Sequence, residues 1–390
     1  MVAEADACAS GESAASLWQS SVRSAAFSAR ILGYPDCKAR DVLLLSARLH
    51  LDVEIVFPKA QEVTPPKKAG KLQEIADHLT RKTKSLRNGG VDHEDEHRVG
   101  LVPNKGWGKR NFEFLHKVLI PGALKSRGGR ERRLDGSEIP AGKARIIWIG
   151  HASFLLQMGG QNILIDPNWA MWLSVVKRAS RPGLTLHQLP PIDLVLITHA
   201  HHDHLDVPTL EAISNGQPIF VPKGVGSLVK KRGFGEIREL EKWESVSVGD
   251  LEIILTPARH WGARYVHDVH RGFGGYLIKP KSGTTVYHAG DSAYFDGFHE
   301  IGSRFEIDVA LMPIGAYRPV SGRGVHMNPE EALAAFADTK AKKMVPMHYG
   351  TFPLTREPLE EPLDRIMLAS SAAGLRHKLA VLEPGQPGIF

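Results

Sequence analysis

Candidate metal ligands are concentrated in the segment Ile197–Leu205, which reads Ile-Thr-His-Ala-His-His-Asp-His-Leu. The segment overlaps the end of the apolar run Asp193–Thr198, so its histidines lie where a buried strand ends and the chain turns outward. His199 and His201 are two residues apart, and in an extended chain this spacing points both imidazoles to the same side. Two nitrogens can then bind one metal ion.

Asp203 and His204 follow directly, at a point where a helix could begin, and offer an oxygen and a nitrogen to a second ion such as zinc. Four ligands are too few for two ions, so further ligands must come from other strand ends. His260, Asp291 and His348 meet this requirement. A lone histidine after a strand is more often an ordinary surface or hydrogen-bonded residue, but the shared position of these three favours a common site. The apolar runs that precede them are Leu251–Thr256, Thr284–His288 and Met344–Met347.

From Ala144 onward the sequence consists of short β-branched and aliphatic runs bounded by turn residues. Many short strands with few long helices predict sheets packed on one another. A helix is indicated after Asn328, because Asn328 can cap it and Pro329 suits its first position. The predicted strands are Ile146–Ile149, Phe154–Met158, Ile163–Ile165, Leu194–Thr198, Ile219–Val221, Leu251–Thr256, Thr284–His288 and Val309–Met312.

The formal net charge of +6 is concentrated in residues 101–145, and the charge of the chain on either side is nearly balanced. In this segment the apolar run Phe112–Ile120 precedes the basic cluster Lys125–Arg133. Such a pairing suits an anionic lipid surface, so residues 112–133 are a candidate for peripheral membrane contact. The alternative is a core-packing helix followed by a solvated basic loop.

Cys8 and Cys37 are the two cysteines, and both are far from the histidine-rich segments, so a cysteine zinc site or a disulfide framework is not expected. The sequence has no apolar run of roughly 18 residues that could span a membrane. Glu4 and Asp6 occupy positions where a secretory signal would carry basic residues. We therefore expect a cytoplasmic protein, with peripheral contact at the inner membrane face as an extension of that expectation.

Several motifs resemble those of the metallo-β-lactamase superfamily, and in particular the N-acyl-phosphatidylethanolamine-hydrolysing phospholipase D group and its bacterial relatives. The resemblance covers about residues 104–360. Besides His199–His204, it rests on Trp148–Phe154, Ile165–Pro167, Leu189–Asp193, Ile314–Pro319, His326 before Pro329–Ala332, and His348–Phe352.

The resemblance implies an α/β fold, a four-layer αββα sandwich of the metallo-β-lactamase type. It implies a hydrolase domain over residues 104–390, preceded by an N-terminal extension, residues 1–103, to which no role can be assigned. Since each candidate ligand follows an apolar strand, we expect all seven at one edge of the paired sheets.

The resemblance further implies a ligand set. His199, His201 and His260 would bind one zinc ion, Asp203, His204 and His348 the other, and Asp291 would bridge them. His151 would orient ligands, and His326 would face the substrate. The sequence does not fix the metal, because sites built from His and Asp also accept iron or manganese. His288 has no counterpart in the family pattern, and we expect it to pack beside the site.

Two neighbouring cations lower the pKa of a shared water toward about 7, which supplies a hydroxide nucleophile at neutral pH. Asp203 or Asp291 could orient this nucleophile, so both are candidate catalytic residues together with His326. His326, Tyr317 and Arg318 are candidates to bind an anionic group of the substrate. Tyr317 and Arg318 could equally be structural.

The site predicts hydrolysis but does not name the bond. The resemblance favours a phosphodiesterase of the phospholipase D type that acts on N-acyl-phosphatidylethanolamine-like phospholipids. The alternative is a lactonase acting on a sugar phosphate or another lactone. A nuclease is disfavoured, because the catalytic part has no basic track for nucleic acid. A scaffold without activity is disfavoured because every expected ligand position is filled. The oligomeric state stays open.

Overall fold

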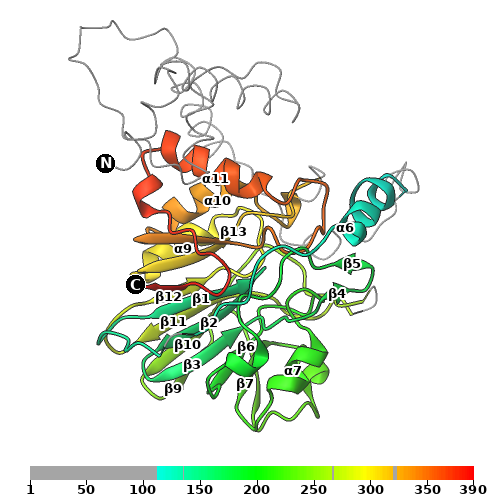
Figure 1. Cartoon of the computed structure of the whole chain (residues 1–390). Coiled ribbons are helices and arrows are strands. Elements are labelled where there is room, and N and C mark those ends of the chain that lie inside the picture. The colour runs from blue at the N-terminus through cyan, green and yellow to red at the C-terminus, as the bar shows by residue number, and fades with distance from the viewer. Residues whose placement is uncertain (1–111, 135, 266–267, 319–322) are drawn as a thin grey trace, which may run out of the picture. The chain divides into compact units, whose positions relative to one another are not determined.

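The structure is a computed structural model (Figure 1), and it describes residues 112–134, 136–265, 268–318 and 323–390. The predicted N-terminal extension, residues 1–103, lies outside the described residues, as do residues 104–111. All the candidate site residues fall within the described part of the chain.

One sheet has seven strands in the order β15-β1-β2-β3-β6-β7-β8. Its first four strands pair antiparallel, with Ile147 of β1 opposite Leu155 of β2, whereas β3, β6, β7 and β8 pair parallel. The strands are β1 (Arg145–Gly150), β2 (Ser153–Met158), β3 (Gln161–Ile165), β6 (Leu194–Leu196), β7 (Ile219–Pro222), β8 (Ile237–Leu240) and β15 (Pro387–Ile389).

The second sheet has six strands in the order β14-β13-β12-β11-β10-β9. β10, β12, β13 and β14 all run in one direction, because β10 and β12 both pair antiparallel with β11 while β12, β13 and β14 pair parallel. Their carboxyl ends therefore meet at one edge. The strands are β9 (Ser245–Val248), β10 (Leu251–Thr256), β11 (Gly275–Pro280), β12 (Val286–His288), β13 (Val309–Pro313) and β14 (Lys343–Met347).

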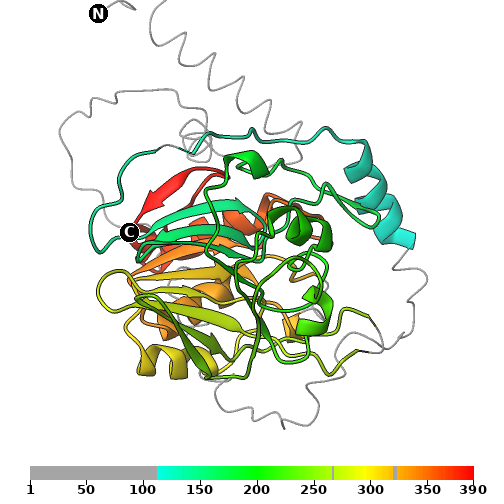
Figure 2. The ribbon, with the colours of Figure 1, turned by 90° about the horizontal axis from the view of Figure 1, so that it is seen from below.

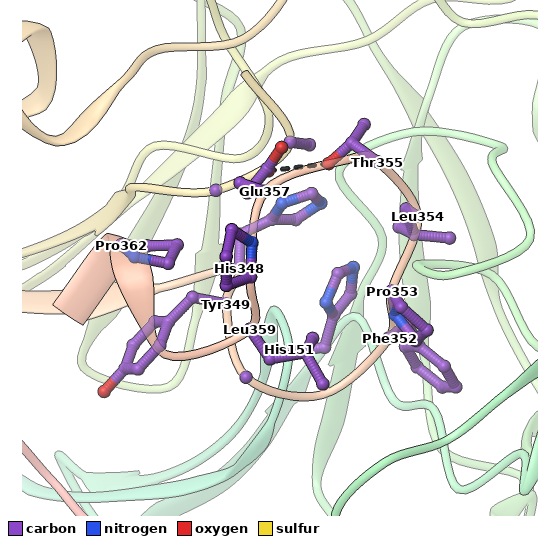
Figure 3. Close-up of a pocket in the computed structure, with 14 residues that line it drawn as sticks. His151, His348, Tyr349, Phe352, Pro353, Leu354, Thr355, Glu357, Leu359 and Pro362 are labelled. Atoms are coloured by element: carbon purple, nitrogen blue, oxygen red, sulfur yellow. Dashed lines mark hydrogen bonds between the residues drawn. The ribbon is translucent and has the colours of Figure 1, made fainter. Parts of the chain in front are cut away.

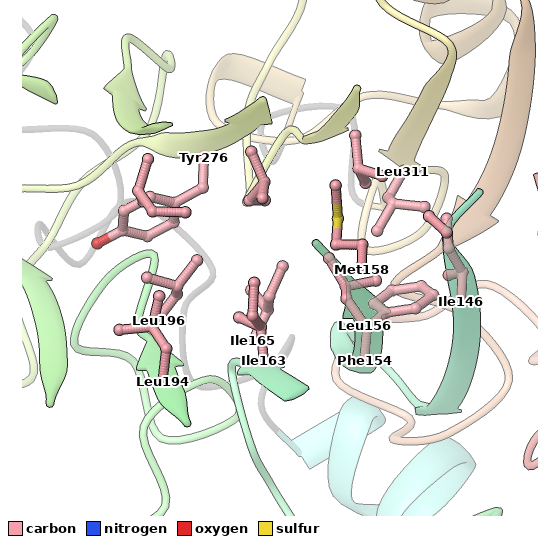
Figure 4. Packing of buried hydrophobic residues seen from close by; sticks show 14 of the residues in the cluster. Ile146, Phe154, Leu156, Met158, Ile163, Ile165, Leu194, Leu196, Tyr276 and Leu311 are labelled. Atoms are coloured by element: carbon pink, nitrogen blue, oxygen red, sulfur yellow. The ribbon is translucent and has the colours of Figure 1, made fainter. Parts of the chain in front are cut away.

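The two sheets pack face to face over the main hydrophobic core. Phe154 and Leu196 of the seven-stranded sheet and Tyr276 and Leu311 of the six-stranded sheet all belong to this core, and none of the four is exposed. Figure 4 shows these side chains between the sheets. Burial of each such side chain contributes about 1.5–3 kcal/mol, so the sheets form a rigid base for the loops at their ends.

Helices cover the outer face of each sheet (Figure 1). Phe298, Phe336 and Ile366, from α9, α10 and α11, pack against Tyr287 of the six-stranded sheet, and Leu210 and Val229, from α7 and α8, pack against the other sheet. The predicted four-layer αββα sandwich is confirmed. The helices are α7 (Val207–Ile213), α8 (Gly226–Val229), α9 (Gly297–Arg304), α10 (Pro329–Asp338) and α11 (Glu361–Ala372), with short 3₁₀ turns η3 (Leu186–Gln188) and η5 (Arg376–Lys378).

Each predicted strand is present, and the helix predicted after Asn328 is α10. The expected helix start at Asp203 and His204 is wrong, because α7 begins at Val207 and is capped by Asp206, whose carboxylate accepts from the backbone N–H of Thr209. Residues 202–204 form a turn instead. β4 (Trp172–Leu173), β5 (Val176–Lys177), β8, β9, β11 and β15 were not predicted.

Residues 112–124 form a short helix that contains a π-helical stretch, η2 (Leu115–Leu119), followed by α6 (Ile120–Leu124). Neither η2 nor α6 has a buried residue, so the alternative of a core-packing helix in this segment is wrong. Among the helices that the structure describes, none has both the length and the apolar character needed to cross a membrane.

Candidate metal centre

The three histidines of the first predicted ligand group lie together at one edge of the sheets. His199 and His201 come from the loop after β6, and His260 comes from the loop after β10. His201 Nδ1 lies 2.9 Å from His199 Nε2 and 3.2 Å from His260 Nε2. His199 and His260 are almost completely buried. Three nitrogens this close can bind one metal ion.

The second group surrounds the carboxylate of Asp203. His204 Nε2 lies 3.7 Å from Asp203 Oδ2, and His348 Nε2 lies 3.5 Å from it. His151 Nε2 lies closer still, 2.9 Å from the same oxygen. All four residues could contribute an atom to one ion, so His151 has the position of a ligand as well as that of an orienting partner.

Asp291, in the loop after β12, lies between the two groups. Its Oδ2 atom is 4.0 Å from His199 Nε2 and 3.9 Å from His260 Nε2 on one side. On the other side it is 3.3 Å from His204 Nε2 and 3.0 Å from His348 Nε2. The structure thus brings all seven predicted ligands together, with one carboxylate in reach of both groups.

Five histidines of the cluster are held in the neutral form that a metal ion requires. Burial lowers the pKa of His201 and of His326 to about 4 and the pKa of His151 to about 3. Burial also lowers the pKa of His199 and His260 well below the ordinary value. A neutral imidazole keeps the lone pair with which it coordinates a metal.

The imidazoles of His204 and His348 offset the negative charge of the Asp203 and Asp291 carboxylates. Burial lowers the pKa of His348, but Asp291 and Asp203 outweigh this effect and raise it to about 9. For His204 the same carboxylates outweigh burial and hold the pKa well above its usual value. Burial alone would raise the pKa of Asp291, but His348 and His204 keep it well below the usual range. Bound metal ions would replace these protons as the positive charge that the carboxylates face.

Two buried atoms without partners indicate that this cluster of side chains fits metal ions. His201 Nε2 and Asp291 Oδ1 are buried, and neither has a hydrogen-bond partner. A buried polar atom without a partner costs about 1–3 kcal/mol, so native structures rarely leave one in place without a reason. The donor set of imidazole nitrogens and carboxylate oxygens suits zinc, iron or manganese.

Asp166 holds the ring of His204 directly and the ring of His199 through Thr198. Its Oδ2 atom lies 2.7 Å from His204 Nδ1 and accepts from the Thr198 hydroxyl at 2.6 Å, and its Oδ1 atom accepts from the Thr198 backbone N–H at 2.7 Å. The Thr198 hydroxyl in turn lies 3.0 Å from His199 Nδ1. Such contacts fix the ring orientation of metal-ligating histidines. Asp166 lies in the motif Ile165–Pro167 of the family resemblance, but no role was predicted for it.

The turns that carry His151 and His348 hold each other across the two sheets. The His348 backbone N–H donates to the His151 carbonyl at 3.0 Å, and the His151 N–H donates to the Thr351 hydroxyl at 2.8 Å. Both histidines have positive φ, 54° and 61°. Gly315 is required beside them, because a Cβ there would lie 2.1 Å from the His348 carbonyl oxygen.

The other two histidines, His288 and His326, also lie beside the cluster. The two ring nitrogens of His288 lie 3.0 Å from the Ala152 carbonyl and 3.1 Å from the Gly290 N–H, so His288 packs beside the site. His326 Nδ1 lies 3.7 Å from Asp291 Oδ2, and its side chain is 17% exposed. The Asp203 side chain is 13% exposed, whereas Asp291 is 1% exposed. His326 and Asp203 therefore form the accessible part of the cluster.

Tyr317 and Arg318 interact with α11. The Tyr317 hydroxyl donates to Glu361 at 2.9 Å, and the Arg318 guanidinium donates to the same carboxylate at 2.7 Å. Tyr317 is almost completely buried, and Arg365 lies over its ring. This network fits the structural alternative for both residues, and substrate binding by them stays a prediction.

A pocket opens beside His151 and His348 (Figure 3). Much of its wall is the loop that follows His348, including Phe352, Pro353 and Leu354. On the far side of the cluster the Trp261 ring packs against His201, with ring centroids 4.4 Å apart. The motif His348–Phe352 covers the first part of the pocket loop, but no role beyond metal binding by His348 was predicted for it. Trp261 was missed because its side chain cannot ligate a metal ion.

Comparison with known proteins agrees with this geometry. A family model described as a beta-lactamase superfamily domain matches residues 161–349. A UPF0173 metal-dependent hydrolase of Pyrobaculum arsenaticum is 34% identical over 245 residues, which are 62% of this chain and 97% of that protein. The chain belongs to the metallo-β-lactamase superfamily. It is thus a member of a family of metal-dependent hydrolases.

Two further proteins are similar over somewhat longer stretches. An uncharacterized protein of Mycobacterium tuberculosis is 35% identical over 260 residues, which are 63% of this chain and 68% of that protein. The N-acyl-phosphatidylethanolamine-hydrolyzing phospholipase D of Saccharomyces cerevisiae is 30% identical over 293 residues, which are 71% of this chain and 60% of that protein.

Solved structures match the fold. Igni18, a metallo hydrolase from Ignicoccus hospitalis, is 30% identical and superposes with a TM-score of 0.51, covering 64% of this chain and 98% of Igni18. An isothiocyanate hydrolase from Delia radicum gut bacteria has a TM-score of 0.53 at 21% identity, covering 63% of this chain and 99% of that one. The second likeness shows the fold alone.

Proposed function

We propose that this protein is a binuclear zinc phosphodiesterase of the phospholipase D type that acts on N-acyl-phosphatidylethanolamine-like phospholipids. The observation that carries the proposal is the pocket beside His151 and His348. Its wall combines the candidate metal centre with apolar side chains, among them Phe352, Leu354 and Leu359. Such a wall suits a substrate with a long apolar part better than it suits a sugar phosphate.

The similarity to phospholipases D supports the same substrate class. Besides the yeast protein, an N-acyl-phosphatidylethanolamine-hydrolyzing phospholipase D of Caenorhabditis elegans is 33% identical over 241 residues, which are 56% of this chain and 67% of that protein. In this proposal His199, His201 and His260 bind one ion, and Asp203, His204 and His348 bind the other. Asp291 binds both, as its central position permits.

When bound, the two metal ions would supply an activated water and positive charge that stabilises a developing phosphoryl anion. The protein side chains determine where the reaction takes place. Asp203 is the accessible carboxylate, so it accepts a hydrogen bond from the attacking water and orients it. His326 is neutral at pH 7 because burial lowers its pKa to about 4, so it can donate one N–H to a phosphoryl oxygen.

The proposed reaction breaks the bond between phosphorus and the oxygen of the ethanolamine group. Water adds its oxygen to phosphorus, the N-acylethanolamine leaves with a proton, and phosphatidic acid remains. The test is to incubate the metal-loaded chain with N-acyl-phosphatidylethanolamine in heavy-oxygen water and to identify the products by mass spectrometry. We expect N-acylethanolamine and a phosphatidic acid that carries the heavy oxygen.

The lactonase alternative gives a different result in a parallel experiment. If the chain hydrolyses members of a lactone panel, sugar phosphate lactones included, but no phospholipid, the phosphodiesterase proposal is overturned. If the heavy oxygen appears in a released fatty acid, the enzyme cleaves an acyl bond, and the proposed bond is wrong.

A further inference from the structure

Exposed apolar side chains gather on two neighbouring segments of the described chain. Ten large apolar residues of the described part are exposed, and six of them belong to the 112–124 helix or to the β4–β5 hairpin. Leu124 is 83% exposed, Val175 is 64% exposed and Trp172 is 47% exposed. We call these six residues the apolar face: Phe112, Leu115, Ile120, Leu124, Trp172 and Val175. Exposed apolar side chains that cluster mark an interaction surface, whereas scattered ones do not.

The helix and the hairpin are fastened together, so the apolar face lies on one joined unit. Lys177 Nζ, at the end of β5, donates to the carbonyls of Ala123 and Lys125 at 2.7 Å and 2.8 Å. Arg127 donates to the Met171 carbonyl at 3.2 Å. Both cations also lie over the Trp172 ring, 5.9 Å from its centroid. Figure 1 shows α6 beside β5 and β4.

The charges of the two segments that carry the apolar face are mainly positive, and Lys125 lies 4.0 Å from Glu360 of the neighbouring loop. Residues 112–127 and 171–177 carry the cations Lys117, Lys125, Arg127 and Lys177. The one carboxylate in these two segments is Glu113, which lies 3.8 Å from the Arg356 guanidinium. Apolar and aromatic side chains bordered by lysine and arginine are typical of a surface that inserts into the headgroup region of an anionic membrane.

The apolar face borders the pocket of the candidate active site. A Cβ at Gly122 would lie 3.7 Å from Pro353 Cγ, which is an ordinary packing distance, and Pro353 lines the pocket. The ion pair between Glu113 and Arg356 joins the helix to the same loop. A lipid in a bilayer under the apolar face would thus lie next to the pocket that leads to His348.

The hairpin is also connected to the metal centre through buried contacts. Arg178 follows β5 and is completely buried. Its guanidinium donates to the carbonyls of Asn168 and Ser180 and lies over the Phe352 ring. The Asn168 side chain donates to the Asp203 carbonyl at 3.0 Å. These contacts fix the hairpin relative to the site.

Only the first residues of the basic cluster Lys125–Arg133 border the apolar face. The chain leaves α6 and runs across the molecule toward β1 (Figure 2), and Arg132 forms an ion pair with Glu383 near the C-terminus. Glu131 lies 3.8 Å from the Arg181 guanidinium in the same region. Lys177 of the β4–β5 hairpin, which was not predicted from the sequence, therefore borders the apolar face where these arginines do not.

We propose that the apolar face is the surface by which this enzyme docks on an anionic lipid bilayer, with Leu124, Trp172 and Val175 inserted among the headgroups. The inference rests on the proposed function, because docking would bring a phospholipid substrate to the pocket. Docking itself requires only the face and its cations, so it can be tested apart from catalysis.

The test measures co-flotation of the full-length, metal-loaded chain with vesicles of phosphatidylcholine alone or with added phosphatidylglycerol. We expect binding to the anionic vesicles that weakens with salt, since exposed charges are screened. The double variant Leu124→Asp, Val175→Asp should bind about tenfold less, because charged side chains replace inserted apolar ones. The matched control is Leu368→Asp, which alters a residue that is 66% exposed on α11, and it should bind like the unchanged chain.

Hydrolysis of a water-soluble phosphodiester separates docking from the proposed function. Equal rates for the double variant and the unchanged chain, together with lost vesicle binding, support docking. Equal vesicle binding by both, or no preference for anionic vesicles, overturns docking whatever the activity. Vesicle binding without hydrolysis of any phosphodiester would overturn the proposed function and leave docking in place. A dimer in sedimentation that the double variant abolishes would show that the face pairs two copies, which also overturns docking.

Discussion

Asp291 is the residue on which the candidate site depends most. Its Oδ2 atom lies within 4.0 Å of one nitrogen from each of four candidate ligands and from His326. Asp291 shares one possible metal site with His199 and His204 and another with His260 and His326, so it reaches ligands of both predicted groups. A carboxylate with two oxygens can bind two ions at once, so it can set the distance between them.

We therefore expect Asp291→Ala to lose most of both ions, whereas the unchanged chain binds about two per molecule after reconstitution. Hydrolysis should fall more than about 100-fold, because even residues outside the ligand set typically change affinity or activity 10–100-fold. Elemental analysis and rate measurements check this. Asp296→Ala, which alters an exposed carboxylate five positions along, is the control. One ion or none in the unchanged chain would contradict the two-metal interpretation.

Asp166 offers a test of orientation without direct metal contact. Asp166→Asn keeps the shape of the side chain but weakens the contact with His204 Nδ1 and with Thr198. We expect metal affinity to fall about 10–100-fold while the chain stays folded. Competition with a chromogenic chelator measures the affinity, and circular dichroism checks the fold. An unchanged affinity would mean that the ring of His204 is held by its other neighbours.

At the scale of elements, sequence patterns predicted the strands that are apolar throughout and missed the edge strands with mixed composition. Buried runs such as Ile146–Ile149 are recognisable because every residue is apolar. β8 and β9, the edge strands of the two sheets, mix polar and apolar residues and were missed. β11 was missed because Gly274 and Gly275 resemble a turn. In fact, a Cβ at Gly275 would lie 2.5 Å from the His288 carbonyl oxygen, so this glycine permits close strand approach.

The candidate site was easier to predict than the surface around it. A histidine or aspartate that follows a strand is recognisable as a possible metal ligand from its residue type alone. The strand directions then bring these residues to one edge. Each strand of the β4–β5 hairpin is only two residues long. The hairpin is held in place by contacts with a helix that is far away in the sequence. Local periodicity contains no information about such a contact.

The capping box of α10 gives a prediction at the scale of one element. Asn328 Oδ1 accepts from the Glu331 N–H at 2.8 Å, and the Glu331 side chain accepts from the Asn328 N–H at 3.2 Å. We expect Asn328→Ala to lower the free energy of unfolding by about 1 kcal/mol. Denaturant unfolding measures the change, and Asn328→Asp, which keeps a capping oxygen, should have little effect. A loss above about 3 kcal/mol would mean that Asn328 also supports the neighbouring His326.

At the scale of the whole molecule, the candidate ligands join the two sheets. His199, His201, Asp203 and His204 follow a strand of the seven-stranded sheet, whereas His260, Asp291 and His348 follow strands of the six-stranded sheet. Bound metal ions would therefore hold the sheets together at the edge where the loops gather. The contact between the His151 and His348 turns is one of the hydrogen bonds that already join the sheets here, together with that from the Gly274 N–H to the Thr198 carbonyl.

Metal removal should consequently lower the stability of the entire fold. A ligand at 1,000 times its dissociation constant stabilises the native state by about 4 kcal/mol, and each kcal/mol shifts Tm by about 2–4 °C in a domain of 150–250 residues. We expect chelation to lower Tm by about 10 °C and added zinc to restore it. Differential scanning fluorimetry measures the shift. Hydrogen exchange should show faster exchange around both His204 and His348 after chelation, because the two sheets lose the same clamp. The Asp291→Ala variant should not respond to the chelator. If metal-loaded and chelated chains of verified metal content melt at the same temperature, the ions do not hold the sheets together.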